Sequence, residues 1–159
     1  MKTRTLKAIL LAFSLLPAVV TRSAQTQPTD TLTQLLAATS LTCQFSSKGT
    51  EATWDSGRLK ITEKALPASM TTLTWGSIDR KAGKARLIAD VGPIDVVVMT
   101  TKTGITLIEE TFLGNLNFTT VFANYDSPLS RRFLAVRSFH QSVNGPFPSQ
   151  YYGTCRAWH

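Results

Sequence analysis

The chain has 159 residues with a formal net charge of +7, and it contains only two cysteines and two histidines. Two histidines without a nearby cysteine or carboxylate cluster do not supply a standard zinc site. The sequence also lacks a Gly-x-Ser-x-Gly elbow, a phosphate-binding glycine loop and a His-Glu-x-x-His helix. Metal-dependent hydrolysis and serine-type acyl transfer are therefore unsupported, and we predict no catalytic residue, no metal ligand and no cofactor.

Residues 1–24 have the order of a secretory signal peptide. A basic segment precedes the 13-residue apolar run Ala8–Val20, and the small residues Ser23 and Ala24 follow it. A spanning helix needs about 20 apolar residues, so this run predicts a cleaved signal and no stable membrane insertion. We therefore expect a secreted or periplasmic protein.

Removing this segment changes the charge of the chain. Four of the 17 basic residues lie in it and all 10 acidic residues lie after it, which leaves a net charge of +3 on about 135 residues. No basic stripe interleaved with aromatic residues is present, so nucleic acid is not an expected partner. The remaining length suits a single domain with one core.

Residues 25–39 are predicted to form a polar leading segment and a short helix. The helical pattern runs from Thr29 to Ala38, with Thr29 or Asp30 as the N-cap, and its leucines share one face. Two or three turns are marginally stable alone. We expect this helix to pack against the rest of the domain as a lid or plug.

From residue 40 to the C-terminus, residue 159, the pattern has a period of two, and β-branched and aromatic runs alternate with turn residues. The predicted strands are SLTCQF, RLKIT, TLTW, KARLIAD, IDVVVMT, GITLIEET, NFTTVFA, RRFLAVRSFH and SQYYGTCRAW. Short connections such as Asp79–Gly83 join them. This pattern predicts an all-β domain, an antiparallel up-and-down barrel of about eight strands, with a β-sandwich as the alternative.

The two cysteines bear on how the barrel closes. Cys43 lies in the first predicted strand and Cys155 in the last, and an exported chain favours a disulfide between them. First and last strands are neighbours in a closed barrel, so the bond would join its seam. Nine separate runs would make these two strands parallel. Eight strands, with KARLIAD and IDVVVMT joined as one strand bent at Gly92–Pro93, would make them antiparallel, and both counts remain open.

The expected architecture is similar to that of the calycin barrels, which include the lipocalins and the avidins. The Gly-x-Trp motif of the first lipocalin strand is absent, because Gly49 and Trp54 are too far apart. The similarity concerns architecture alone and implies no function.

Two predicted strands place charged residues in phase with apolar ones. Glu109 shares a face with apolar residues in GITLIEET, as Arg137 does in RRFLAVRSFH. The opposite faces carry Glu110 and His140, so the pattern leaves open which residues point inward. A charge inside a barrel needs a partner or water, and this allows either a structural ion pair or a ligand site.

Our leading functional prediction is a non-enzymatic barrel that binds a small, partly apolar ligand in or at its mouth. The predicted ligand-binding residues are Glu109, Arg137, His140, Trp75 and Phe122. The aromatic residues would equally fill a small solid barrel, since eight strands leave room for side chains or one small ligand.

Two other functions remain as alternatives. A protein-interaction module, such as an inhibitor of a secreted hydrolase, would use long loops at residues 123–133 and 141–151. An enzyme that uses Glu109 and Arg137 for proton transfer ranks last, because no acid–base pair with diagnostic spacing is present.

Overall fold

The computed structural model describes residues 28–111, 113–142 and 146–159, and the predicted signal peptide lies outside these ranges. The elements are α1 (Pro28–Ala37), β1 (Ser40–Phe45), β2 (Lys48–Asp55), β3 (Arg58–Ala65), the 3₁₀ turn η1 (Ala68–Met70), β4 (Thr72–Asp79), β5 (Lys84–Ala89), β6 (Gly92–Thr100), β7 (Gly104–Glu110), β8 (Leu116–Tyr125), β9 (Phe133–Ser142) and β10 (Pro146–Trp158). Within the described residues, no helix is both long and apolar enough to cross a membrane.

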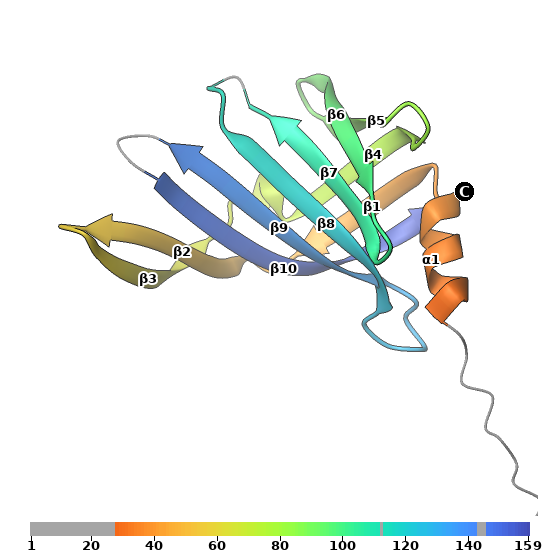
Figure 1. Ribbon diagram of the computed structural model, residues 1–159, viewed down its shortest axis with the longest axis horizontal. Helices are drawn as coiled ribbons and strands as arrows, with labels where there is room; N and C mark the ends of the chain where they lie inside the picture. The colour runs from red at the N-terminus through yellow and green to blue at the C-terminus, as the bar shows by residue number, and fades with distance from the viewer. Residues whose placement is uncertain (1–27, 112, 143–145) are drawn as a thin grey trace, which may run out of the picture.

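Eight of the strands close into an antiparallel barrel (Figure 1). Their order is β1-β4-β5-β6-β7-β8-β9-β10, and β10 pairs back onto β1. Sequence neighbours are also spatial neighbours from β4 onward, which gives the up-and-down topology. The predicted all-β barrel is confirmed, and the sandwich is excluded.

The barrel has eight strands, but they are not the eight strands that the sequence predicted. KARLIAD and IDVVVMT are not one bent strand, because Ala89 pairs with Gly92 across a tight turn and makes β5 and β6 antiparallel neighbours. Gly92 has a φ of 109°, a conformation that favours glycine at this turn. The run RLKIT instead lies outside the barrel as β3, paired with the unpredicted strand β2. The sequence of β2, KGTEATWD, contains few strand-favouring residues, and pairing with β3 holds it extended.

The seam of the barrel carries the predicted disulfide. Cys43 lies directly opposite Cys155 in the antiparallel β1–β10 ladder, and their sulfur atoms are bonded. Both residues are fully buried. Because 112 residues separate them, the bond restricts most of the unfolded chain.

Helix α1 covers one end of the barrel. It packs against β7 and β8, with Leu35 completely buried. The side-chain oxygen of Gln34 accepts hydrogen bonds from the Tyr125 hydroxyl and from Arg131 Nη2, which ties the helix to the end of β8 and to the loop that follows. The expected packing of a short N-terminal helix against the barrel is confirmed.

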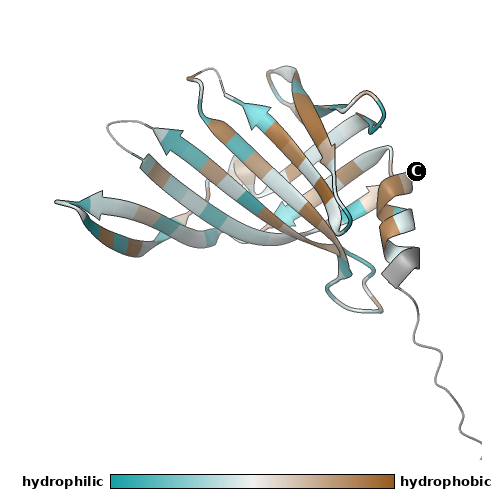
Figure 2. Cartoon of the chain, in the orientation of Figure 1, coloured by the Kyte–Doolittle hydropathy of each residue, from teal (hydrophilic) through white to brown (hydrophobic). Residues whose placement is uncertain are grey.

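The core consists of inward-facing side chains that alternate with outward ones, visible as bands of contrasting hydropathy along the strands (Figure 2). Its largest fully buried apolar members include Trp75, Leu41, Ile105, Leu107 and Val121. These residues fill the half of the barrel next to α1 and its middle. The core continues toward the opposite end with the buried side chains of Phe45, Phe139 and Tyr151, and the candidate site lies at that end.

Candidate functional site

A buried ion pair crosses the barrel interior. Glu109 of β7 and Arg137 of β9 are 4% and 3% exposed. Arg137 Nη2 donates to Glu109 Oε2 at 2.7 Å and Arg137 Nη1 donates to Glu109 Oε1 at 2.9 Å. This bidentate geometry neutralises both charges and fixes the orientation of the guanidinium plane.

Three neighbours hold the pair in place. Trp75 Nε1 donates to Glu109 Oε1 at 3.1 Å, and Arg137 Nη1 donates to Thr119 Oγ1 at 2.8 Å. The guanidinium carbon of Arg137 lies 4.8 Å from the Phe139 ring centre and 5.9 Å from that of Trp75. Side chains from β4, β7, β8 and β9 therefore meet at one charged, aromatic-flanked cluster. Arg137 Nε is buried without a hydrogen-bond acceptor among the described residues.

Above this cluster a cavity of about 720 Å³ opens at the barrel end away from α1. We call it the mouth cavity; it is lined by Ser69, Met70, Thr72, Leu73, Leu87, Ile88, Ala89, Asp90, Val91, Ile94, Glu109, Glu110, Thr111, Asn117 and Arg137. The lining comes from η1, the starts of β4, β6 and β8, the ends of β5 and β7, and Arg137 of β9. The ion pair thus forms part of the lining of a largely apolar hollow.

The structure brings together three of the five predicted ligand-binding residues. Glu109, and not Glu110, faces the interior, as does Arg137 and not His140. Trp75 contacts both Glu109 and Arg137. His140 is exposed, with its ring 4.8 Å from that of Phe118.

Phe122 does not join this cluster either. It follows the fully buried Val121 in β8 and so lies on the outer face of that strand. Neither Phe122 nor His140 lines the mouth cavity.

Sequence reasoning missed Thr119 and Asn117, the polar residues of β8 that face the interior. The sequence pattern could have indicated both, because they lie at alternate positions on the same strand face as the apolar Val121. Thr119 is fully buried beside Arg137 and accepts its hydrogen bond. The cluster therefore combines one acid, one base, an indole and a hydroxyl.

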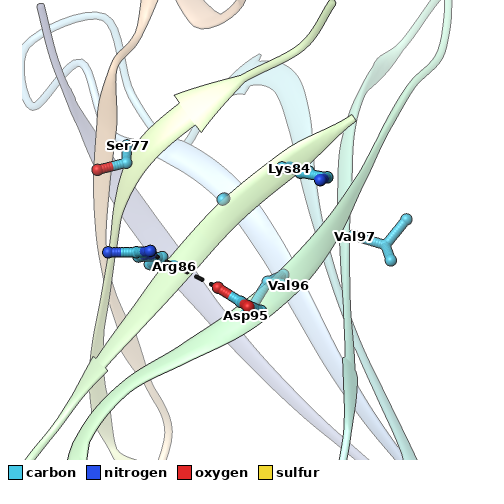
Figure 3. Close-up of a pocket in the computed structure, with 7 residues that line it drawn as sticks. Ser77, Lys84, Arg86, Asp95, Val96 and Val97 are labelled. Atoms are coloured by element: carbon cyan, nitrogen blue, oxygen red, sulfur yellow. Dashed lines mark ion pairs between the residues drawn. The ribbon is translucent and has the colours of Figure 1, made fainter. Parts of the chain in front are cut away.

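A second hollow, of about 340 Å³, lies on the outer surface where β4 is irregular (Figure 3). The register between β4 and β5 shifts between Gly76 and Asp79, and Ser77 has a φ of 52°. Arg86 Nε and Asp95 Oδ1 approach to 3.5 Å there, with both side chains exposed. Exposed pairs of this kind contribute little binding or stability, so the mouth cavity is the stronger candidate site.

The two predicted interaction loops are shorter than expected. Residues 126–132 connect β8 and β9, whereas residues 123–125 extend β8 and residue 133 begins β9. In the second region, β9 continues to Ser142 and β10 begins at Pro146, while residues 143–145 lie outside the described ranges. Most of residues 141–151 therefore form strand, because the long β9–β10 ladder includes them.

Comparison with known protein families finds no family model that matches the chain, and comparison with curated proteins finds no match. In the part of the chain that the structure describes, no three His, Cys, Asp or Glu side chains gather as a metal site would require. The function is therefore inferred from the geometry of the mouth cavity.

Proposed function

We propose that the protein binds a small, partly apolar ligand in the mouth cavity, against the Glu109–Arg137 pair. The observation that carries this proposal is a cavity of about 720 Å³ that reaches a buried, oriented ion pair. Ligand pockets in proteins have volumes of about 300–1,000 Å³ and combine apolar walls with a few placed polar groups. The mouth cavity has both properties.

The apolar wall supplies the driving force for binding. Leu73, Leu87 and Ile94 line the cavity on adjacent strands, and Ile88 and Val91 are exposed at its edge. A hydrocarbon group placed among them removes apolar surface from water, at about 25 cal/mol for each Å². This wall selects a ligand with a substantial apolar part.

The charges of the lining restrict the polar part of the ligand. Among the described lining residues, Asp90, Glu109 and Glu110 contribute three carboxylates, whereas Arg137 is the only base and is already paired with Glu109. An anionic head group would meet an excess of negative charge and would compete with Glu109 for Arg137. We therefore expect neutral or cationic amphiphiles to bind better than anionic ones.

The compartment is part of the same proposal. The Cys43–Cys155 disulfide supports export, because such bonds persist in oxidising compartments. A secreted or periplasmic barrel of this kind would carry or sequester its ligand, and no chemical step is proposed.

A displacement assay tests both the site and its charge preference. Neutral N-phenylnaphthylamine serves as the fluorescent probe, and decanol, decylamine and decanoate compete with it. We expect decanol and decylamine to displace the probe at lower concentration than decanoate. Because Ala89 lines the cavity in phase with the buried Leu87, Ala89→Trp should place an indole inside the cavity and weaken probe binding by at least about tenfold.

The matched control is Ala82→Trp, at an exposed position in the turn at the opposite end of the barrel. It adds the same side chain without entering the mouth cavity, so its probe affinity should equal that of the unmodified protein. Equal probe affinity in Ala89→Trp and Ala82→Trp would show that the probe binds elsewhere and would refute the proposed site.

A further inference from the structure

The β2–β3 hairpin projects away from the barrel on the side opposite α1 (Figure 1). It joins the barrel through two residue pairs, in which Thr50 and Glu51 of β2 face Gln150 and Ser149 of β10. Among the described residues, β3 pairs with β2 alone. Its outer edge therefore offers unpaired backbone donors and acceptors, which are a template for a further strand.

The base of this hairpin is firmly packed. Gly49 lies so close to the carbonyl oxygen of Gln150 and the ring of Tyr151 that no side chain fits at this position. The Tyr151 hydroxyl donates to the carbonyl oxygen of Ala65 at 3.3 Å, and its ring packs edge-on against Phe139. The free edge is thus presented from a fixed position on the barrel.

Near its tip, one face of the hairpin is apolar and exposed, whereas the base of the same face carries the Lys48–Glu63 ion pair. Trp54 lies opposite Leu59 in the β2–β3 ladder, so the two side chains share a face, and Ile61 follows on the same face. These side chains are 50%, 56% and 65% exposed, respectively. Alternating hydropathy is visible along β3 (Figure 2). A cluster of large apolar residues on one exposed face marks an interaction surface.

The other face of β3 is basic. Arg58, Lys60 and Lys64 lie on it at alternating positions. Lys64 is paired with Glu51 of β2 at 2.9 Å, whereas neither Arg58 nor Lys60 forms an ion pair with any described residue. Two positive charges next to a free strand edge favour a partner that carries negative charge on the same face.

A second copy of the chain does not meet this requirement. Symmetric antiparallel pairing of two β3 strands centred on Lys60 would place Lys60 opposite itself. Centring on Ile61 would place Arg58 opposite Lys64, and centring on Thr62 would place Lys60 opposite Lys64. Like charges directly opposite each other destabilise a strand pair, so each of these registers is unfavourable.

We propose that β3 is a docking edge for an extended protein segment in which acidic and apolar residues alternate. The segment adds one strand to the sheet through backbone hydrogen bonds. Its apolar side chains lie beside Leu59 and Ile61, and its carboxylates lie beside Arg58 and Lys60. Because side chains alternate between the two faces of every strand, a single register places the apolar residues of the segment on one face and its carboxylates on the other.

The test uses the full chain with its disulfide intact and a fluorescent synthetic peptide of alternating glutamate and valine, as long as β3. We expect saturable binding, measured by fluorescence anisotropy, that weakens with added salt. Lys60→Glu replaces an attraction by a repulsion and should weaken binding by roughly tenfold. The matched control Lys102→Glu changes an exposed lysine in the β6–β7 loop and should leave binding unchanged.

A second peptide separates edge pairing from simple charge attraction. It has the same composition, with all glutamates in one block and all valines in another, and it should bind at least about tenfold more weakly because it satisfies only one face at a time. Equal binding of the two peptides, equal affinities for Lys60→Glu and Lys102→Glu, or no binding would overturn the proposal. A dimer in sedimentation experiments that Lys60→Glu dissociates would overturn it in favour of a second copy.

Discussion

Replacing Glu109 by leucine while Arg137 remains is expected to destabilise the fold by about 3–5 kcal/mol, the usual cost of leaving one partner of a buried pair uncompensated. Glu109 accepts hydrogen bonds from both Nη atoms of Arg137 and from Trp75 Nε1. After the substitution Arg137 keeps only its bond to Thr119 in a site that is almost closed to water. Arg137→Leu should cost a similar amount, because it leaves the carboxylate with the indole alone.

The double variant Glu109→Leu/Arg137→Leu removes both charges and should cost less than the two single costs combined. If the two effects were independent, they would add to about 6–10 kcal/mol. Instead, the double variant orphans only Trp75 Nε1 and the Thr119 hydroxyl, at about 1–3 kcal/mol each. With the middle of each range, the single costs sum to about 8 kcal/mol and the double variant costs about 4 kcal/mol, so the ion pair predicts a coupling energy of about 4 kcal/mol.

Urea denaturation followed by far-ultraviolet circular dichroism measures all four proteins with the disulfide intact. Where a single variant is too unstable to fold, the uncharged but isosteric Glu109→Gln replaces Glu109→Leu in the cycle. Single costs that add within about 0.5 kcal/mol in the double variant would refute the ion pair as a coupled unit.

Three further variants test the parts of the fold that surround the site. Replacing Cys43 and Cys155 together by alanine should lower the free energy of unfolding by about 2–5 kcal/mol in urea. In the unmodified protein, the mass measured after denaturation without reduction should be lower than the reduced mass by two hydrogen atoms. Leu35→Ala leaves a cavity where the fully buried side chain of α1 packs against the barrel, and it should lower the free energy of unfolding by about 2–5 kcal/mol in the same assay. Gly49→Ala forces the hairpin away from Tyr151, so amides of β2 should exchange hydrogen faster while those of β8 keep their protection.

Strand alternation predicted much of the barrel but left the inner face of β9 undecided. In RRFLAVRSFH both faces carry apolar residues, so the run alone did not distinguish Arg137 from His140. Pairing resolves it, since Arg137 lies opposite Thr119 in β8 and Tyr151 in β10, and both of these neighbours are buried. Such information depends on contacts between distant segments, which a local pattern does not contain.

The hairpin illustrates the same limit more sharply. RLKIT alternates as a barrel strand does, yet Leu59 and Ile61 are exposed because β3 lies outside the barrel. The disulfide was predictable, because closure of a barrel makes its first and last strands neighbours whatever lies between them. The mouth cavity was not predictable, since its lining comes from seven elements, η1 and the six strands β4 to β9.

Native mass spectrometry of the protein incubated with decanol tests the central claim most directly. The proposed function predicts a complex of one protein and one decanol molecule that is lost on denaturation, that persists in Ala82→Trp and that is much less abundant in Ala89→Trp. A protein that binds no decanol, or that binds it equally in both tryptophan variants, would contradict a ligand site in the mouth cavity.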